Sequence, residues 1–459
     1  MDDGRWTASQ SSIVHRRPPY GHMTVDEPTT RASLAELARY FVRLGFTAFG
    51  GPAAHIAIME DDVVRRRRWL TRAHFMDMLA ATQLVPGPNS TEMAIHIGYV
   101  QQGIPGLIVA GVCFILPAFL IVLAISIAYV IYGKLPAVGA LFYGIQPVIV
   151  AIVIQATYRL GRSAWKAIAF RVLGVIALLA TLFAPIDPVW VIVIGGLAGV
   201  IITRAGIPAG GAALLMLLDE KRLLMTIGHR RSAAIAGTIS RGAEHLIAPL
   251  AQAASEPALW QLALFFLKVG ATLIGSGYLL ISYLQNDLVN RFGWLTPRQL
   301  IDAIAVGQMT PGPVFTTAAF VGYVIRAGPA GDITRGAIGA AVCALAIFLP
   351  SFLIVGLLGP LMPRLRTSNI AAAFLDGVNA AVVGTIAATT WMLFLTAAIN
   401  LATPVLALPL AGVTLDLPAT LLAVSATALL LRDRAPNSTI LIGIGALVGL
   451  LAQALAGRL

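Results

Sequence analysis

The chain has 459 residues, of which 58% are hydrophobic and only 12% are charged. Soluble domains carry about 25% charged residues, and many apolar runs here reach the roughly 20 residues that cross a bilayer. The composition therefore excludes an ordinary soluble protein and predicts an all-α polytopic membrane protein. The net charge of +11 is scattered between apolar runs, as cytoplasmic loops of membrane proteins are, so no nucleic-acid partner is expected.

The N-terminal part of the chain changes from polar to apolar near residue 34. Residues 1–33 lack the apolar core of a signal peptide and are interpreted as a disordered cytoplasmic tail. The apolar segment that follows is interrupted at Gly50-Gly51-Pro52. A basic stretch at 65–72 comes next, and Thr71 suits the N-cap of the following helix.

Two short stretches each interrupt what otherwise reads as one spanning helix. Gln83 to Pro88 reads Gln-Leu-Val-Pro-Gly-Pro, and Gln308 to Pro313 reads Gln-Met-Thr-Pro-Gly-Pro. Proline removes a backbone donor and clashes with the preceding turn, so both triplets break their helices. Within a membrane, such breaks are tolerated where they are buried in protein or line a wet cavity, which makes them candidates for a transporter's binding site.

The remaining apolar runs complete a plan of ten to twelve membrane segments. They are expected at 104–132, 138–158, 164–184, 188–204, 258–284, 299–325, 336–361, 369–398, 401–431 (with a turn at Pro418) and 437–457. The charged stretch between the fourth and fifth runs is interpreted as a linker. The predicted domains are a first half at 34–204, a linker at 205–257 and a second half at 258–459.

The two halves are homologous. A shift of 225 positions aligns 41–88 with 266–313 without a gap and gives 17 identities in 48 positions, including both Pro-Gly-Pro triplets. Residues 65–72 hold five arginines, whereas 290–297 hold only Arg291. Because cytoplasmic loops collect Lys and Arg, this difference favours an inverted repeat with its two-fold axis in the membrane plane.

The motifs resemble those of the chromate transporter family in its long, duplicated form. They are Gly45 to His55 (Gly-Phe-Thr-Ala-Phe-Gly-Gly-Pro-Ala-Ala-His), then Arg68-Trp69-Leu70, then Gln83 to Pro88. The resemblance covers both halves, although Ser276-Gly277-Tyr278 replaces Gly51-Pro52-Ala53 in the second copy. It implies secondary active export of chromate across a bacterial-type inner (plasma) membrane, giving chromate resistance, with sulfate as the related oxyanion.

Other functions are weighed against this one. An uncoupled anion channel would use the same broken helices, and another oxyanion such as sulfate would fit the same site. A membrane-embedded enzyme would need a metal cluster or a nucleophile–base set, which the seven scattered histidines and two cysteines do not suggest. No nucleotide-binding motif is visible, so ATP coupling would need a partner chain. We expect no enzyme activity, no cofactor and no metal; a homodimer is possible.

Substrate-binding candidates are the polar and glycine positions at the breaks and two aligned cations. They are Arg43, Thr47, Gly50, Gly51, Gln83, Pro86, Gly87, Pro88, Asn89 and Ser90 in the first half, and Lys268, Thr272, Gly275, Ser276, Gln308, Pro311, Gly312, Pro313 and Thr316 in the second. Helix N-termini after the breaks offer N–H donors and positive dipole ends to a tetrahedral dianion. The simpler explanations are helix capping for Asn89 and Ser90, close helix packing for the glycines, and snorkelling for Arg43 and Lys268.

Candidates for proton coupling are Glu92, Asp77, Asp302 and His55, because ionisable groups inside a membrane are costly to keep. Glu92 follows the first break and repels an anion unless it is protonated, so it is the first choice. Asp77 and Asp302 occupy equivalent positions early in their helices. A carboxylate there also suits the helix dipole, which is the alternative for both.

Overall fold

A computed structural model describes ten ranges of the chain. They are residues 31–83, 85–133, 135–165, 167–184, 186–204, 256–358, 368–398, 407–410, 413–432 and 437–457. Within them the fold is helical except for one antiparallel hairpin of β1 (Ala407–Leu410) and β2 (Val413–Asp416), in which Leu410 lies opposite Val413. The predicted all-α class is confirmed. The predicted tail at 1–33 and linker at 205–257 lie almost wholly outside the described residues.

The helices of the first half follow the predicted runs closely. They are α1 (Leu34–Thr47), α2 (Gly51–Met59), the π-helix η1 (Glu60–Arg66), α3 (Arg72–Thr82), α4 (Asn89–Tyr132), α5 (Pro136–Ala164), α6 (Ile168–Phe183) and α7 (Pro188–Arg204). Inside α4, Gln102 and Gly103 leave helical geometry, with φ of +60° at Gly103. This kink divides α4 into two helices.

The helices of the second half repeat this order. They are α10 (Leu259–Thr272), α11 (Leu279–Tyr283), the π-helix η2 (Leu284–Arg291), α12 (Pro297–Met309), the 3-10 turn η3 (Val314–Thr316), α13 (Thr317–Ala327), α14 (Ile333–Leu358), α16 (Asn369–Ala398), α17 (Leu417–Leu430) and α18 (Ser438–Leu455). The run at 299–325 is broken at the second Pro-Gly-Pro triplet, as predicted, and the run at 258–284 is broken between Thr272 and Leu279. Pro418 stands in the first turn of α17, where a missing N–H costs nothing, and not at a turn.

Local capping starts the helices that lead to the breaks. The Thr71 side chain accepts a hydrogen bond from the His74 backbone N–H, as predicted. At the equivalent place in the second half, Thr296 and Gln299 form a capping box. Both caps satisfy orphan N–H groups at helix starts.

In each half, the segments before the kink fold into two hairpins that enter and leave on the same face. The Gln101 side chain, at the end of the second hairpin, accepts from the Ala32 backbone N–H at 3.0 Å and donates to the Trp69 carbonyl at 2.9 Å. Residue 32 precedes α1 and residue 69 lies between η1 and α3, so these chain positions share one face. The second half repeats the contact, with Arg326 donating to the Pro257 carbonyl at 2.8 Å.

The equivalent helices of the two halves run in opposite directions. Along α5 and α16, the Trp165 indole N–H reaches the Ala380 carbonyl at 3.5 Å, while the Thr157 and Thr390 hydroxyls lie 3.4 Å apart. Lower numbers on one helix thus meet higher numbers on the other. An antiparallel pair of equivalent membrane-crossing helices requires a two-fold axis in the membrane plane, so the inverted repeat is confirmed.

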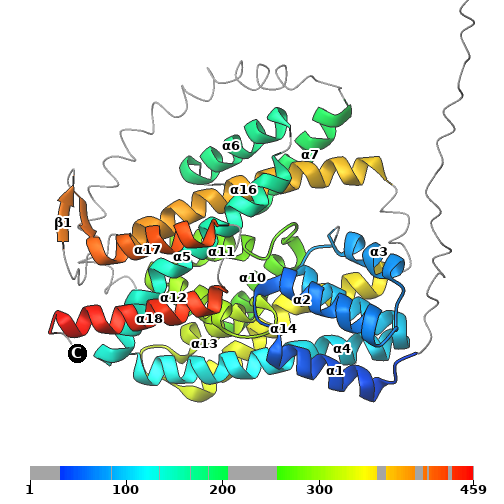
Figure 1. The fold of residues 1–459 in the computed structure, drawn as a ribbon, viewed down its shortest axis with the longest axis horizontal. Coiled ribbons are helices and arrows are strands. Elements are labelled where there is room, and N and C mark those ends of the chain that lie inside the picture. Colours follow the sequence, from blue (N-terminus) through cyan, green and yellow to red (C-terminus); the bar gives the residue numbers. More distant parts are fainter. Residues whose placement is uncertain are drawn as a thin grey trace, which may run out of the picture.

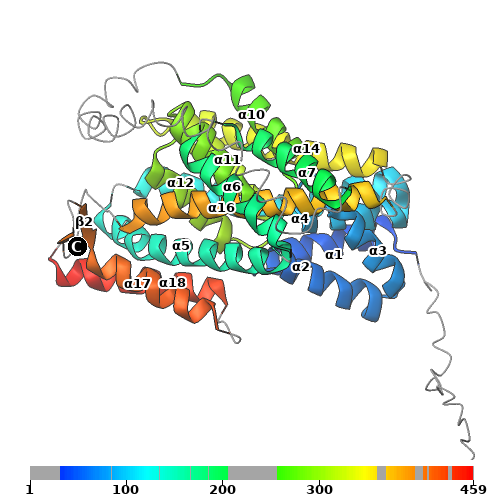
Figure 2. The same cartoon turned by 90° about the horizontal axis from the view of Figure 1, so that it is seen from above.

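The helices assemble into two units that do not coincide with the two halves. The hairpin unit contains α1–α4 and α10–α14, whereas the bundle unit contains α5–α7 and α16–α18. Within the bundle unit the halves are interlocked: α17 and α18 pack on α5, and α6 and α7 pack on α16 (Figure 1). The view in Figure 2 shows α5, α17 and α18 along one side and α10 and α14 along the other. Each unit therefore contains a part of both repeats.

Among the described residues, five helices are long and apolar enough to cross a membrane. They are Asn89–Tyr132, Pro136–Ala164, Ile333–Leu357, Asn369–Ala397 and Ser438–Leu455. Five shorter apolar helices accompany them, namely Ile168–Phe183, Pro188–Arg204, Leu259–Thr272, Val314–Ala327 and Leu417–Leu430. The count of ten to twelve membrane segments stays a prediction.

Close glycine contacts hold the bundle unit together, which gives a first testable prediction. A Cβ on Gly144 of α5 would lie 1.9 Å from the Gly445 carbonyl oxygen and 2.6 Å from the Gly449 nitrogen, both backbone atoms that no rotamer change moves. We expect Gly144→Ala to destabilise the protein by about 1–3 kcal/mol through overpacking. The apparent Tm in detergent should fall. Gly443→Ala on the same helix as Gly445 meets no atom within 4 Å, and a similar fall there would contradict this account.

Candidate functional site

The hairpin tips of the two halves meet inside the hairpin unit by a reciprocal pair of hydrogen bonds. The Gly87 N–H donates to the Leu273 carbonyl at 2.7 Å, and the Gly312 N–H donates to the Ala48 carbonyl at 2.9 Å. A shift of 225 residues converts one bond into the other. Each Pro-Gly-Pro triplet therefore contacts the end of the first helix of the opposite half. The pseudo-two-fold axis relates these two contacts.

Glycine is required at both tips. Gly87 has φ of +135° and Gly312 has φ of +87°, in the region that side chains disfavour. A Cβ on Gly87 would lie 1.6 Å from Glu92 Oε1, and a Cβ on Gly312 would lie 2.8 Å from the Ala118 Cβ. Gly50 and Gly275, at the other two tips, also have positive φ of 102° and 94°. At Gly87 and Gly312, glycine allows both the tight turn and the close approach of neighbouring atoms.

Unpartnered polar atoms gather in the first turn of α4, directly after the first triplet. Ser90 Oγ, Thr91 Oγ1 and Glu92 Oε2 are all buried without a hydrogen-bond partner among the described residues. The N-cap is Pro88, with no side-chain cap bond, so capping does not explain Ser90 or Asn89. Buried polar groups normally find partners, and orphans at a helix N-terminus indicate a place for a ligand or water.

Glu92 is fully buried, and the second half supplies its partner. The Ser351 hydroxyl of α14 donates to Glu92 Oε1 at 2.9 Å. Ser351 was not predicted as a site residue. The signal was present in the repeat, because Leu349-Pro350-Ser351-Phe352 matches Leu116-Pro117-Ala118-Phe119 with a serine in place of alanine. Thr316 and Thr317 stand at the corresponding place after the second triplet, and their hydroxyls donate to the Pro313 and Val314 carbonyls. The first tip therefore has a carboxyl group and the second does not.

The second tip encloses a small cavity. It has a volume of about 10 Å³, enough for one water molecule, and Gln308, Thr317, Tyr278 and Gly277 are among the residues that line it. Gln308 Nε2 is buried and lies within interaction range of the Tyr278 side chain. Thr316 donates to the Pro313 carbonyl and so caps its own turn. Gln83, which aligns with Gln308 in the repeat, is exposed. The two glutamines therefore have different environments although they occupy equivalent sequence positions.

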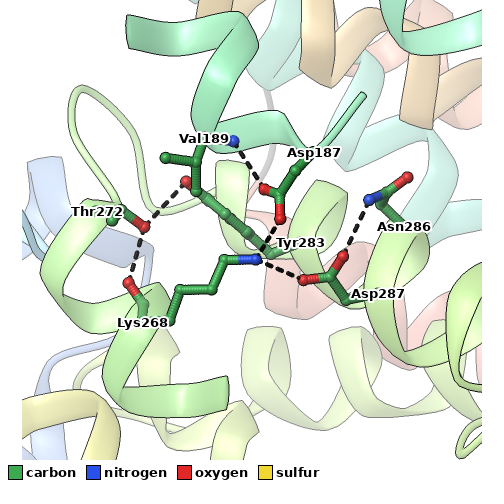
Figure 3. Close-up of polar contacts among 7 residues, drawn as sticks. All are labelled: Asp187, Val189, Lys268, Thr272, Tyr283, Asn286 and Asp287. Atoms are coloured by element: carbon green, nitrogen blue, oxygen red, sulfur yellow. Dashed lines mark hydrogen bonds and ion pairs between the residues drawn. The ribbon is translucent and has the colours of Figure 1, made fainter. Parts of the chain in front are cut away.

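The predicted cations lie away from the tips. Arg43 is exposed on α1. Lys268 lies between two carboxylates: its ammonium group pairs with Asp187, and with Asp287 at 2.9 Å (Figure 3). Its charge is therefore already compensated in this conformation. The Thr47 and Thr272 hydroxyls donate to carbonyls one turn earlier in their own helices, at 2.8 and 2.7 Å.

The remaining coupling candidates differ in burial. His55 is buried, with Nε2 3.1 Å from the Ala48 carbonyl that also accepts from Gly312. Asp302 is only 2% exposed and accepts from Tyr129 and Gln146, at 2.8 and 2.9 Å. Its equivalent, Asp77, is exposed on α3. Sequence reasoning missed Tyr129 and Gln146, because only tertiary packing brings α4 and α5 to Asp302.

Comparisons with known proteins agree with this architecture. A family model described as chromate transporter matches residues 35–200 and 260–450. The chain is 32% identical to a chromate transport protein of Cupriavidus metallidurans over 445 residues, 96% of both chains. It is 31% identical to a probable chromate transport protein of Synechococcus elongatus, covering 82% of this chain and 85% of that protein. It is 33% identical to a chromate transport protein of Pseudomonas aeruginosa, covering 78% and 80%. No solved structure matches.

Inverted repeats and hairpins whose helix breaks each contact the opposite half define a multi-pass membrane transporter rather than an enzyme. Both repeats are covered by the family match, and the relatives span most of the chain. The chain belongs to the chromate transporter family, in its duplicated form.

Proposed function

We propose that the protein is a secondary active transporter that carries chromate out of the cell across the inner membrane of a bacterial-type cell, by alternating access around the crossed hairpin tips. Three relatives named as chromate transport proteins support the substrate. The observation that carries the mechanism is the row of unpartnered buried polar atoms at Ser90, Thr91 and Glu92, placed where the two tips cross. Sulfate, a tetrahedral dianion of the same charge, is the expected competitor.

The tips offer an oxyanion two kinds of donor. The hydroxyls of Ser90 and Thr91 and the N-terminal dipole of α4 lie on the first-half side. The amide of Gln308 lies on the second-half side. A dianion and an ionised Glu92 repel each other in a buried site, so the two are compatible only when Glu92 carries a proton. Anion binding is thereby linked to proton uptake, which is the basis for the proposed coupling.

The binding role of Gln308 has a direct test. Loss of a hydrogen bond to a charged ligand costs about 1.5–3 kcal/mol, so Gln308→Ala should weaken chromate binding about 10- to 100-fold. Chromate binding to purified protein in detergent, measured by calorimetry with and without excess sulfate, checks this. Gln102→Ala is the matched control, because its amide bonds the Ala32 carbonyl at the face where the hairpins enter. Equal affinities for both variants would remove Gln308 from the site.

An uncoupled anion channel is the second candidate function. It would use the same tips but would show no dependence on Glu92. Chromate flux that stops at equal concentrations on both sides would favour it. A homodimer is also proposed; light scattering of the detergent-solubilised protein measures the oligomeric state.

A further inference from the structure

The hairpin unit contacts the bundle unit unequally on its two sides. Three polar contacts between the units involve second-half helices of the hairpin unit. Lys268 of α10 pairs with Asp187 before α7, Asp302 of α12 accepts from Gln146 of α5, and Ser282 of α11 accepts from Thr389 of α16. The first-half equivalents of Lys268 and Ser282 are Arg43 and Ala57, and both are exposed.

Apolar residues show the same inequality. Ile301 of α12 is fully buried, whereas its equivalent Met76 of α3 is 45% exposed. Tyr283 is fully buried, whereas its equivalent Ile58 is 36% exposed. The two surfaces are equivalent in the sequence repeat, but their environments differ. Among the described residues, one side of the hairpin unit is docked on the bundle unit and the other is not.

The undocked side contains a cleft at the matching place. It has a volume of about 300 Å³ and is lined by Ala57, Ile58, Asp61, Asp62 and Arg66. The equivalents of Ala57, Ile58 and Asp62 are Ser282, Tyr283 and Asp287, which belong to the surface that Thr389 and Lys268 contact. The cleft is thus the counterpart of a surface that is filled on the other side.

The corner of the bundle unit that reaches Lys268 has its own counterpart. Asp187 caps α7 by accepting from the Val189 N–H at 3.0 Å, and Asn437 caps α18 by accepting from the Thr439 N–H at 3.0 Å. Each is the N-cap of the last helix of its half. The docked corner therefore carries a carboxylate where the other corner carries a neutral amide.

We propose that the Lys268–Asp187–Asp287 cluster (Figure 3) is a latch that holds the transporter closed on the side away from the basic 65–72 stretch, and that the Asn437 corner docks in the 57–66 cleft in the opposite state. In that state Arg43 and Asp62, which here pairs with Arg66 at 3.4 Å, face Asn437. A cation with one carboxylate and an amide forms a weaker latch than a cation with two carboxylates. The difference between Asp187 and Asn437 therefore sets the resting state as the one seen here. This inference rests on the proposed alternating-access cycle.

The ionic groups fit such a role. The side chains of Lys268 and Asp187 are 33% and 21% exposed, and that of Asp287 is 1% exposed. Asp287 also accepts from the Asn286 amide at 3.0 Å, while Asp187 belongs to the other unit. A half-buried charge pair between two units is strong enough to bias them and weak enough to break in each cycle.

The test uses one cysteine at a time at the pseudo-equivalent positions 76 and 301, in a Cys113→Ala/Cys343→Ala background. A membrane-impermeant maleimide is applied to both sides of vesicle-embedded protein. In variants that keep Lys268, Asp187 and Asp287, we expect the maleimide to label Met76→Cys rapidly and Ile301→Cys slowly. Asp187→Asn preserves the N-cap, because Asn and Asp cap equally well. It should raise the labelling rate of Ile301→Cys at least about fivefold, because it removes about 1 kcal/mol of preference for the latched state.

Asn437→Asp is the matched variant and should lower Met76→Cys labelling by a similar factor. The double exchange Asp187→Asn/Asn437→Asp keeps the total charge and should reverse the order of labelling. Unchanged labelling of both positions in all three variants, with monodisperse protein on size exclusion, would overturn the latch. The labelling experiment needs no chromate, so its result can be interpreted even if chromate is not the substrate.

Discussion

Gly87→Ala should lower the rate of chromate transport about 100-fold. Alanine at φ of +135° is strained, and its Cβ would lie 1.6 Å from Glu92 Oε1 and 2.6 Å from Ser351 Oγ. Relief requires Glu92 to leave Ser351 or the tip to withdraw from Leu273. Either change displaces the site by about 1 Å or more, and displacements of that size cost about 100-fold in rate where geometry is critical.

Initial chromate flux in proteoliposomes measures this loss. Gly443→Ala in α18 is the control, because the added Cβ would meet no atom within 4 Å. That variant should retain flux close to the unmodified protein. Wild-type flux in properly inserted Gly87→Ala protein would show that the first tip does not need its glycine and would remove it from the site.

Glu92→Gln should separate chromate movement from its driving force. The amide has nearly the same shape and still accepts the Ser351 hydroxyl, but it neither gains nor loses a proton. We expect downhill chromate exchange to stay within about fivefold of the unmodified protein, because a neutral isostere retains the hydrogen bond. Accumulation driven by a pH gradient should disappear. The effect is large because coupling needs a group that changes charge.

The control for this variant is Asp77→Asn. Asp77 is an intramembrane candidate of the same chemistry but is exposed on α3. It should keep gradient-driven accumulation. The opposite pattern, with accumulation lost in Asp77→Asn and kept in Glu92→Gln, would move the coupling site from the tip to α3.

The sequence predicted features that depend on local backbone chemistry. Pro-Gly-Pro breaks a helix wherever it occurs, so the breaks at 83–88 and 308–313 could be predicted. Thr71 could likewise be predicted as the N-cap of the helix that begins at Arg72. The repeat was predicted from the identities between 41–88 and 266–313. Its inversion was predicted from the larger number of arginines at 65–72 than at 290–297. What the sequence did not predict is which elements meet: the reciprocal Gly87–Leu273 and Gly312–Ala48 bonds, and the interlocked bundle unit, depend on long-range packing.

The site predictions divide in the same way. Residues at the breaks lie at the crossing point, because the break itself places them there. Lys268 was predicted as a cation for the substrate, but in this conformation it pairs with Asp187, whose position 81 residues earlier gave no sign of contact. Gln83 and Gln308 are equivalent in the repeat, yet one is exposed and the other has a buried amide. Pseudo-symmetry of sequence does not predict symmetry of environment in a molecule that occupies one state at a time.

The most direct test of proton-coupled chromate transport is accumulation against a gradient. Purified protein in proteoliposomes is given equal chromate inside and outside, and a pH gradient is then imposed. The account predicts chromate accumulation above the starting ratio, suppressed by excess sulfate and abolished by a protonophore. Flux that never exceeds equal concentrations, with the gradient intact, would contradict it and identify a channel.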